Sequence, residues 1–300
     1  MNEQDVAQFQ TVPAKTIVTR TKNDRWFGTE YNMNLYRGCC HGCIYCDSRS
    51  DCYQIEQFDT VCVKENALAL VERDLRQKRK KGLVGTGAMS DPYNPLEEKL
   101  QLTRGALLCL ERYRFGAAIA TKSPLVQRDA DILQRIAAYA PVLVKMTITT
   151  YDDALCKKLE PRVAPTSQRL AALKALSAQG LFCGVLLMPL LPYINDTEDN
   201  VLSIVHSAAD SGVKFIYPLF GVTLRSNQRR YFYQQIDRLF PGVKRQYQRQ
   251  GQPYLHQSPR AKELSAAFVR ACRARGLAYS MPDIIERSQR ATRTEQLSMF

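Results

Sequence analysis

Short apolar runs alternate with amphipathic segments along most of this 300-residue chain, and this alternation restricts the possible folds most strongly. Six runs have the length of strands, at 31–36, 83–88, 116–120, 142–148, 181–187 and 213–219. Helical periodicity marks the segments between them, at 64–80, 103–114, 129–140, 166–179 and 196–211. The pattern predicts an α/β fold whose parallel strands form a partial (β/α)6 barrel of the TIM type.

Cysteines gather in the loop that follows the first predicted strand. Five of the ten lie within fourteen residues, namely Cys39, Cys40, Cys43, Cys46 and Cys52. Cys39, Cys43 and Cys46 have the spacing C-x3-C-x2-C, and functional residues of such barrels lie where strands end. Thiolates are soft ligands that bind iron–sulfur clusters or zinc. Three cysteines on one loop predict a [4Fe–4S] cluster whose fourth iron is open to a small molecule.

Zinc is the alternative for this loop. Cys40 and Cys43 form one C-x2-C pair, Cys43 and Cys46 form another, and His41 or Cys52 could complete a site. Structural zinc usually takes a second ligand pair from farther along the chain. No such pair follows, so the spacing favours the iron–sulfur cluster.

The charge of the chain is uneven. The formal net charge is +13, from 42 Lys and Arg against 29 Asp and Glu. Residues 225–300 contain 15 basic and 5 acidic residues, a net of +10, whereas residues 1–224 contain 27 and 24, a net of +3. A basic segment on a nearly neutral body indicates either an anionic partner, most often nucleic acid, or a solvated basic surface.

No apolar run approaches the length of about 18 residues that a membrane span needs, so no membrane partner is expected. The first ten residues, MNEQDVAQFQ, are polar and acidic, unlike a signal peptide. We therefore expect a cytoplasmic protein.

The cysteine loop is one of six sequence blocks that occur in a characteristic order along the chain. The blocks are RGCCHGCIYC, FDTVCVKENA, GTGAMSDPYNPLE, ATKSPLVQRD, TITTYDDALCKKLEP and LMPLLPYIND. Together they resemble the spore photoproduct lyase-like branch of the radical S-adenosylmethionine (SAM) enzymes. The resemblance implies a [4Fe–4S] cluster on Cys39, Cys43 and Cys46, with SAM on the open iron. An electron from a donor such as flavodoxin or ferredoxin would cleave SAM to a 5′-deoxyadenosyl radical, which removes a hydrogen atom from the substrate.

The resemblance also implies roles for single residues around SAM. Tyr45 matches an aromatic residue near the adenosine and a candidate position in the family's radical relay. Ser90, with the adjacent Asp91, matches a SAM contact after the second strand. Lys122 matches the lysine that pairs with the SAM carboxylate, and Thr147 matches a hydroxyl residue that touches SAM. Ordinary loop packing, turn formation, a surface lysine and strand propensity are the respective alternatives.

Two positions depart from the lyase pattern. Ala88 stands where the lyase has a hydrogen-donating cysteine, and Asp47 stands where it has a relay tyrosine. The part that generates the radical is thus complete, whereas the part specific to the lyase has changed. We therefore expect a reaction other than reversal of the spore photoproduct.

The basic segment mixes cations with aromatic side chains, a combination typical of nucleic-acid binding. Its candidate DNA contacts are Arg225, Arg229, Arg230, Lys244, Arg245 and Arg249, interleaved with Tyr231, Phe232, Tyr233 and Tyr247. The alternative is an amphipathic helix whose aromatic side chains pack inward. A packing helix is predicted over 259–275.

The chain ends in QLSMF, which resembles the motif by which bacterial repair proteins bind the β sliding clamp. Leu297, Met299 and Phe300 would fill apolar pockets, and Gln296 would form a hydrogen bond beside them. The preceding SQRATRTE is predicted to be a polar tether, although the end could instead pack against the body.

The sequence therefore predicts an N-terminal extension (1–25), a radical SAM core (26–224), a basic, mainly helical extension (225–290) and a flexible tail (291–300). The favoured function is a radical SAM enzyme that repairs damaged or modified bases in DNA. The alternatives are a radical SAM enzyme acting on RNA, a protein or a small molecule, and a non-enzymatic metal-binding module on DNA.

Overall fold

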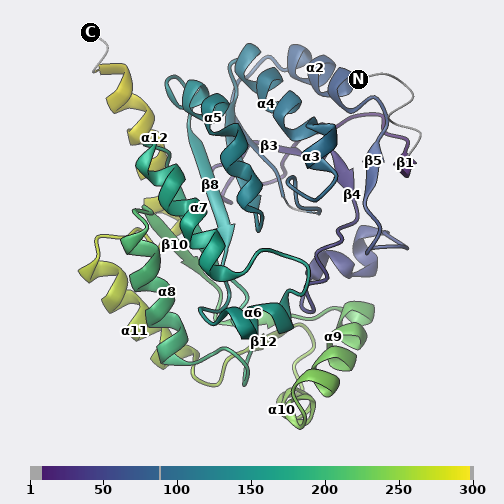
Figure 1. Ribbon diagram of the computed structural model, residues 1–300, viewed down its shortest axis with the longest axis vertical. Coiled ribbons are helices and arrows are strands. Elements are labelled where there is room, and N and C mark those ends of the chain that lie inside the picture. Colours follow the sequence, from purple (N-terminus) through teal and green to yellow (C-terminus); the bar gives the residue numbers. More distant parts are fainter. Residues whose placement is uncertain (1–8, 88, 298–300) are drawn as a thin grey trace.

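The structure is a computed structural model that describes residues 9–87 and 89–297. Its centre is a seven-stranded sheet in the order β10-β9-β8-β7-β6-β3-β2 (Figure 1). The strands are β2 (Val18–Arg20), β3 (Tyr31–Met33), β6 (Leu83–Gly85), β7 (Gly116–Thr121), β8 (Val142–Thr147), β9 (Cys183–Leu187) and β10 (Phe215–Pro218). All neighbours pair in parallel except β2 and β3. The six predicted parallel strands of a partial barrel are confirmed.

Helices cover the outer face of this sheet (Figure 1). They are α2 (Ala67–Gln77), α3 (Glu97–Leu100), α4 (Leu102–Arg112), α5 (Ala130–Ala137), α7 (Thr166–Ala178) and α8 (Glu198–Asp210). Helix α6 (Asp153–Leu159) lies instead beyond the carboxyl end of β8 (Figure 1), where the carbonyl of Leu159 accepts a hydrogen bond from the N–H of Ile44. Side chains alternate along each strand, so Val142, Val144 and Met146 of β8 enter the large apolar core beneath the helices. The predicted helices are present within a few residues, whereas α3 and α6 were not predicted.

A second apolar core fills the concave side of the sheet, which is the interior of the partial barrel. It contains Phe27, Leu143, Leu186 and Phe215, among others. A Cβ atom at Gly184 would lie 2.3 Å from the ring of Phe215. Glycine at this position therefore allows a large aromatic side chain to occupy the interior.

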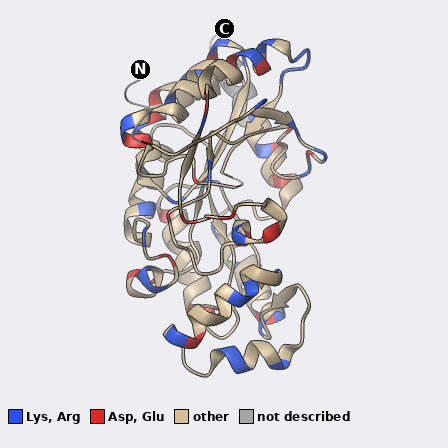
Figure 2. Cartoon of the chain, turned by 90° about the vertical axis from the view of Figure 1, so that its right-hand side faces the viewer, with Lys and Arg blue, Asp and Glu red and all other residues tan. Residues whose placement is uncertain are grey.

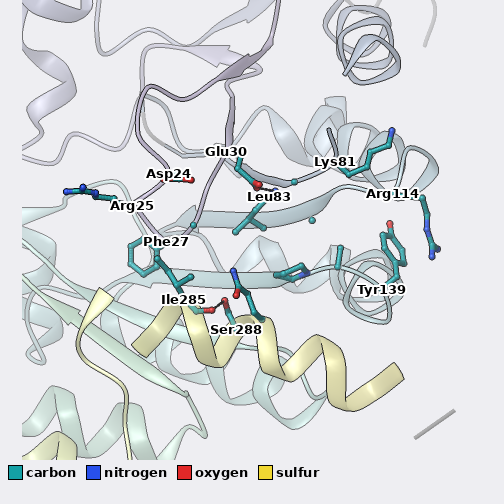
Figure 3. A pocket seen from close by; sticks show the side chains of 16 residues that line it. Asp24, Arg25, Phe27, Glu30, Lys81, Leu83, Arg114, Tyr139, Ile285 and Ser288 are labelled. Atoms are coloured by element: carbon teal, nitrogen blue, oxygen red, sulfur yellow. Dashed lines mark hydrogen bonds between the residues drawn. The ribbon is translucent and has the colours of Figure 1, made fainter. Parts of the chain in front are cut away.

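The C-terminal part of the chain closes the gap between the two edges of the sheet. Ala278 pairs with Phe215, and α12 (Met281–Leu297) follows. Figure 3 shows Phe27 beside Ile285 of this helix. The structure differs here from the tether predicted before the last residues, because α12 continues through Leu297. Glu286 and Arg290 are spaced i and i+4 and form an ion pair, and no Gly or Pro interrupts 283–297.

Two smaller sheets flank the barrel. One has the order β1-β5-β4 and consists of β1 (Thr11–Val12), β4 (Tyr36–Arg37) and β5 (Cys62–Lys64). The other pairs β11 (Gly221–Thr223) with β12 (Leu255–Gln257) in antiparallel register.

Between β11 and β12 the chain forms α9 (Ser226–Leu239) and α10 (Val243–Gln250), which project at the lower right of Figure 1. The predicted packing helix is α11 (Ala261–Ala274), which lies against α8. Helices long and apolar enough to cross a membrane are absent from the described residues.

Candidate active site

The three predicted cluster ligands share one cavity of about 140 Å³. Cys39, Cys43 and Cys46 form one wall, and the loops at the carboxyl ends of β6 to β9 form the others. The lining residues from these ends include Gly87, Ser90, Asp91, Ala120, Lys122, Thr147 and Leu186. The structure thus brings together the three cysteines and four of the five residues predicted to contact SAM.

Main-chain hydrogen bonds hold the cysteine loop against its neighbours. The N–H of Cys39 donates to the carbonyl of Phe58 at 2.7 Å, and that of Ile44 donates to Leu159 at 3.0 Å. Gly38 has a φ of +78°, and a Cβ there would lie 2.1 Å from the carbonyl oxygen of Thr60. Only glycine allows the chain to enter the loop this closely to its neighbour.

Tyr45 lies beneath the loop, outside the lining of the cavity. Its hydroxyl donates to Glu160, which also forms an ion pair with Arg169, and both charged side chains are fully buried. Burial raises the pKa of Glu160, but Arg169 and Lys122 outweigh this effect and hold that pKa below its usual value. The observed contacts of Tyr45 anchor the loop, and its role near SAM or in a radical relay stays a prediction.

Arg169 connects this network to the barrel. Its guanidinium donates to the carbonyl of Thr147 at the end of β8 at 2.8 Å and to that of Ala164 at 2.7 Å. One buried ion pair therefore joins the cysteine loop, through Tyr45, to the strand end that lines the cavity.

Lys122 is the cation that faces the buried cysteines. Burial lowers the pKa of its ammonium, but Cys43 and Glu160 outweigh burial and raise that pKa above its usual value. Its Nζ atom lies 5.8 Å from the centre of the Tyr45 ring. Lys122 is therefore charged at neutral pH and suited to pairing with an anionic ligand group in the cavity.

Asp91 orders the loops that form the cavity wall. Its carboxylate accepts hydrogen bonds from the Thr121 hydroxyl at 2.6 Å, the Lys122 N–H at 2.8 Å and the Tyr93 N–H at 2.9 Å. The Nδ1 atom of His41 lies 3.6 Å from the same carboxylate. These contacts account for Asp91 as a positioning residue, although it also lines the cavity.

The Ser90 hydroxyl is buried in the cavity wall without a hydrogen-bond partner among the described residues. A buried hydroxyl that lacks a partner costs free energy, so its position favours a polar ligand. Gly87, three residues before Ser90, has a φ of +89°, and a Cβ atom at Gly87 would lie 2.1 Å from the carbonyl oxygen of Ala120. The residues present therefore fit a ligand that brings hydrogen-bonding groups to this wall.

Burial favours the protonated thiol over the thiolate at the three cysteines. Burial raises the pKa of Cys39 to about 12 and also raises those of Cys43 and Cys46. Binding to iron would release these protons, since the thiolate is the ligand. Across the described chain, no three His, Cys, Asp or Glu side chains gather closely enough for one metal ion. Three thiolates on different irons of a cube need not approach one another so closely.

The comparison with protein families decides the classification. The model of the radical SAM superfamily matches residues 33–205, more than half of the chain. The chain belongs to the radical SAM superfamily. The resemblance predicted from the sequence is therefore confirmed, and a [4Fe–4S] cluster and SAM are the cofactors of this superfamily. The chain is a radical SAM enzyme.

Relatives with similar sequences span most of the chain. An uncharacterized protein of Mycobacterium tuberculosis is 30% identical over 266 residues, covering 85% of this chain and 78% of that protein. An uncharacterized protein of Methanocaldococcus jannaschii is 33% identical over 174 residues, covering 57% of this chain and 64% of its own length.

Solved structures share the fold at low sequence identity. A spore photoproduct lyase complexed with dinucleoside spore photoproduct has a TM-score of 0.65 at 16% identity, covering 89% of this chain and 79% of that chain. The radical SAM methyltransferase TsrM from Kitasatospora setae, solved with cobalamin and a [4Fe–4S] cluster, has a TM-score of 0.53 at 12% identity. That match covers 81% of this chain and 50% of TsrM.

Two positions depart from the lyase pattern, and the structure describes one of them. Ala88 lies outside the described residues. Asp47, directly after the third cysteine, accepts hydrogen bonds from Arg225 at 3.1 Å and from Tyr53 at 3.2 Å. Asp47 therefore attaches the cysteine loop to the start of α9, so this position has a structural role here.

The six predicted DNA-contacting cations divide into two groups. Three of them form contacts that hold the extension together. Arg225 donates to Asp47 and Tyr254, and Lys244 pairs with Asp237. Arg229 donates to the carbonyls of Leu224 and Pro253. The side chains of the other three are exposed, namely Arg230, Arg245 and Arg249.

The aromatic side chains of the extension mostly pack inward. Phe232 and Tyr247 are fully buried in a small core that also contains Leu191 and Leu224. For Phe232 and Tyr247 the structure therefore bears out the alternative of inward-packing aromatic side chains, because α9 and α10 bury these rings in that core. Tyr231 is half-buried, with the Arg49 guanidinium 3.9 Å from its ring centre.

A larger pocket, of about 570 Å³, lies at the opposite end of the strands. It is lined by Leu83 and Gly116, which begin β6 and β7, and by Ile285 and Ser288 of α12 (Figure 3). The cysteine cavity lies where the same strands end. In TIM-type barrels the chemistry occurs at the carboxyl ends of strands, so the smaller cavity is the active-site candidate.

Sequence reasoning missed Glu160, Arg169 and Gln228. Glu160 stood within a block used for the resemblance but had no separate signal, and an arginine on a helix usually faces solvent. The Gln228 amide donates to the carbonyl of Tyr45 at 3.1 Å from 183 residues away. Such a contact follows only from the packing of α9 on the cysteine loop.

Proposed function

We propose that this radical SAM enzyme acts on a damaged or modified base in DNA. One observation carries the proposal: helix α9, which bears an exposed arginine, is bonded directly to the cysteine loop. The Asn227 side chain donates to the carbonyl of Arg49 and accepts from the N–H of Asp51, while Gln228 donates to Tyr45. A phosphate backbone bound along α9 and α10 would therefore lie beside the active-site loop.

The distribution of charge supports this surface. Blue segments at the lower end of Figure 2 mark Lys and Arg on the helices there. Arg230 of α9 and Arg245 and Arg249 of α10 are exposed, and α9 and α10 contain Asp237 as their single acidic residue. Phosphate contacts by such cations supply most of the affinity of proteins for DNA without reading the sequence.

Different residues of the cavity would hold the cluster and SAM. Cys39, Cys43 and Cys46 would bind the cluster, and Lys122 would pair with the carboxylate of SAM. The Ser90 hydroxyl would form a hydrogen bond with the bound ligand. When bound, the cluster and SAM supply one-electron chemistry that removes a hydrogen atom from the substrate. We propose flavodoxin or ferredoxin as the electron donor. Ligand pockets usually exceed about 300 Å³, so the cavity is expected to widen on loading.

A base in duplex DNA would have to leave the stack to reach this cavity. Extrusion costs a few kcal/mol and costs least for a damaged or unpaired base. We propose a reaction other than that of spore photoproduct lyase, because Asp47 and Ala88 replace the two residues that the lyase uses to return a hydrogen atom. Asp47 is also committed to contacts with Arg225 and Tyr53.

Neutralising the exposed arginines is expected to weaken DNA binding. The triple variant R230Q/R245Q/R249Q should bind a 20-base-pair duplex at least about tenfold more weakly at moderate salt. The slope of log affinity against log salt should become shallower by about 2 to 3, since each phosphate contact contributes about 0.9. Fluorescence anisotropy over a series of salt concentrations measures both quantities.

The matched control removes the same charge from another surface. R76Q/R79Q/K80Q alters exposed residues at the end of α2 and beyond, and α2 lies at the opposite end of the molecule from α9 and α10 in Figure 1. It should retain the wild-type affinity and slope. Equal weakening in both triple variants would indicate a general charge effect and contradict a DNA surface on α9 and α10.

The substrate class is tested by product formation. Reconstituted enzyme, SAM and a reductant are incubated anaerobically with undamaged, UV-treated or alkylated DNA, and 5′-deoxyadenosine is quantified. Stimulation by one form of damaged DNA is the expected result. If transfer RNA or a peptide stimulated 5′-deoxyadenosine formation and no DNA did, the proposed DNA substrate would be contradicted in favour of RNA or a protein.

We also propose that the C-terminus binds the β sliding clamp. The motif QLSMF at the chain end supports this proposal. The backbone of Gln296 and Leu297 belongs to α12, and Met299 and Phe300 lie outside the described residues. The L297A/F300A variant of the full chain should lose at least about 90% of its binding to purified clamp in surface plasmon resonance, since buried anchors dominate such interfaces. Unchanged binding, or none by the wild type, would contradict this.

A further inference from the structure

A buried phenylalanine lines the cysteine cavity without belonging to an apolar core. Phe58 is 5% exposed and forms part of the cavity wall. The buried apolar side chains of the described residues form three clusters, and Phe58 is a member of none of them. Packing within a core therefore does not account for this ring, and the space that it borders is the cavity.

The main chain and a neighbouring cation hold the ring in place. The carbonyl of Phe58 accepts a hydrogen bond from the N–H of Cys39 at 2.7 Å. The guanidinium carbon of Arg49 lies 4.8 Å from the centre of the Phe58 ring, and Asp59 holds that guanidinium with hydrogen bonds of 2.6 and 2.8 Å. Because Arg49 occupies one face of the ring, Phe58 presents its other face or its edge to the cavity.

The same cation connects Phe58 to the proposed DNA surface. The guanidinium carbon of Arg49 also lies 3.9 Å from the centre of the Tyr231 ring of α9, and the preceding Arg230 is exposed. Two ring–cation contacts, from Phe58 to Arg49 and from Arg49 to Tyr231, therefore span the distance from the cavity wall to α9. Phe58 lies on the part of that wall that is connected to the basic helix.

We propose that Phe58 stacks on the target nucleobase of the substrate in the active-site cavity. The proposal rests on the proposed function in that the substrate brings a base to this cavity. Aromatic side chains stack on nucleobases of any sequence, because every base has a π-face. Arg49 acts as a positioning residue, since it holds the Phe58 ring by a cation–π contact. Phe58 would then select for a flat aromatic group next to the cofactors.

The first test measures binding of a free nucleoside. The protein carries the oxidised [4Fe–4S] cluster and SAM, which stays intact because no electron is supplied, and equilibrium dialysis with radiolabelled thymidine gives the affinity. F58L should bind thymidine at least about fivefold more weakly than the wild type, as expected for loss of one base–aromatic stack. F58Y keeps the ring and should bind thymidine as the wild type does. Isothermal titration calorimetry should show unchanged affinity for SAM in both variants.

F115L is the matched control. Phe115 is fully buried and also has a cation over its ring, with Nζ of Lys81 4.8 Å from the ring centre. It belongs to the large core beneath the helices and lies outside the cavity lining, so F115L should keep the wild-type affinity for thymidine. Unchanged thymidine binding in F58L, or equal weakening in F115L, would overturn the proposal. Weaker binding of SAM in F58L would also overturn it, because the ring would then serve the cofactor.

The second test uses the wild-type protein and does not depend on the folding of a variant. 5-Iodo-2′-deoxyuridine is added to the oxidised, SAM-bound protein and irradiated. Light breaks the carbon–iodine bond, the uracil carbon bonds to an adjacent aromatic ring, and hydrogen iodide leaves. Tandem mass spectrometry should locate the crosslink at Phe58, and excess thymidine should suppress it. Crosslinks at other residues alone, or no crosslink, would overturn the proposal.

These tests separate failure of this proposal from failure of the DNA substrate. If no DNA stimulates 5′-deoxyadenosine formation but the crosslink lies at Phe58 and F58L binds thymidine weakly, the DNA proposal fails and a base-stacking site remains. If damaged DNA stimulates the wild type and neither nucleoside test involves Phe58, the DNA proposal stands and the role of Phe58 is refuted.

Discussion

Replacing Arg169 with methionine is expected to destabilise the protein by about 3–5 kcal/mol. The side chains of Arg169 and Glu160 are both fully buried, so R169M leaves the Glu160 carboxylate without its cation. The variant also removes the donors to the carbonyls of Thr147 and Ala164. Because Glu160 also accepts from Tyr45, the cysteine loop should loosen together with the end of β8.

Urea denaturation of the metal-free protein measures this change in the free energy of unfolding. R112M is the control, since Arg112 forms an exposed pair with Glu72 and should contribute less than about 1 kcal/mol. The double variant E160Q/R169M should lose at least about 1 kcal/mol less than the sum of its single variants. Additive losses, or a loss in R169M no larger than in R112M, would contradict the buried network.

Replacing a cluster cysteine is expected to have the largest effect on activity. C43S should lower the iron and sulfide bound after anaerobic reconstitution. It should also reduce 5′-deoxyadenosine formation at least about 1000-fold, or about 4 kcal/mol. The reason is that Cys43 lines the cavity with Cys39 and Cys46, and the hydroxyl of serine is a poorer ligand for iron than a thiolate.

The matched control is C109S, because Cys109 lies on α4 outside the lining of the cavity. It should bind iron and sulfide and form product as the wild type does. If C43S and C109S behaved alike, Cys43 could not be a cluster ligand.

The periodicity of the sequence predicted the barrel well because its strands are buried on both faces. A run such as 181–187 contains no polar or charged side chain, and its flanking helices have clear apolar faces, so local pattern and tertiary position agree. The short strands β1, β2 and β4 were not predicted. They contain two or three residues each and are formed by pairing with distant segments, which no local pattern reports.

Candidate cluster ligands could be predicted from the sequence because their spacing lies within one loop. The residues that position the loop could not, because Glu160, Arg169 and Gln228 reach it from separate elements. The aromatic residues of the basic segment were ambiguous for the same reason. Whether Tyr247 stacks on a ligand or packs in a core depends on how α10 is placed, and the structure buries it.

The most direct test of the central claim is cleavage of SAM by the reconstituted wild-type protein. The protein is loaded with iron and sulfide under anaerobic conditions, reduced with dithionite and given SAM, and 5′-deoxyadenosine and methionine are quantified by liquid chromatography. The assignment of Cys39, Cys43, Cys46 and Lys122 to cofactor binding predicts that both products form in equal amounts. Protein that carries a complete [4Fe–4S] cluster and yet forms no 5′-deoxyadenosine would contradict it.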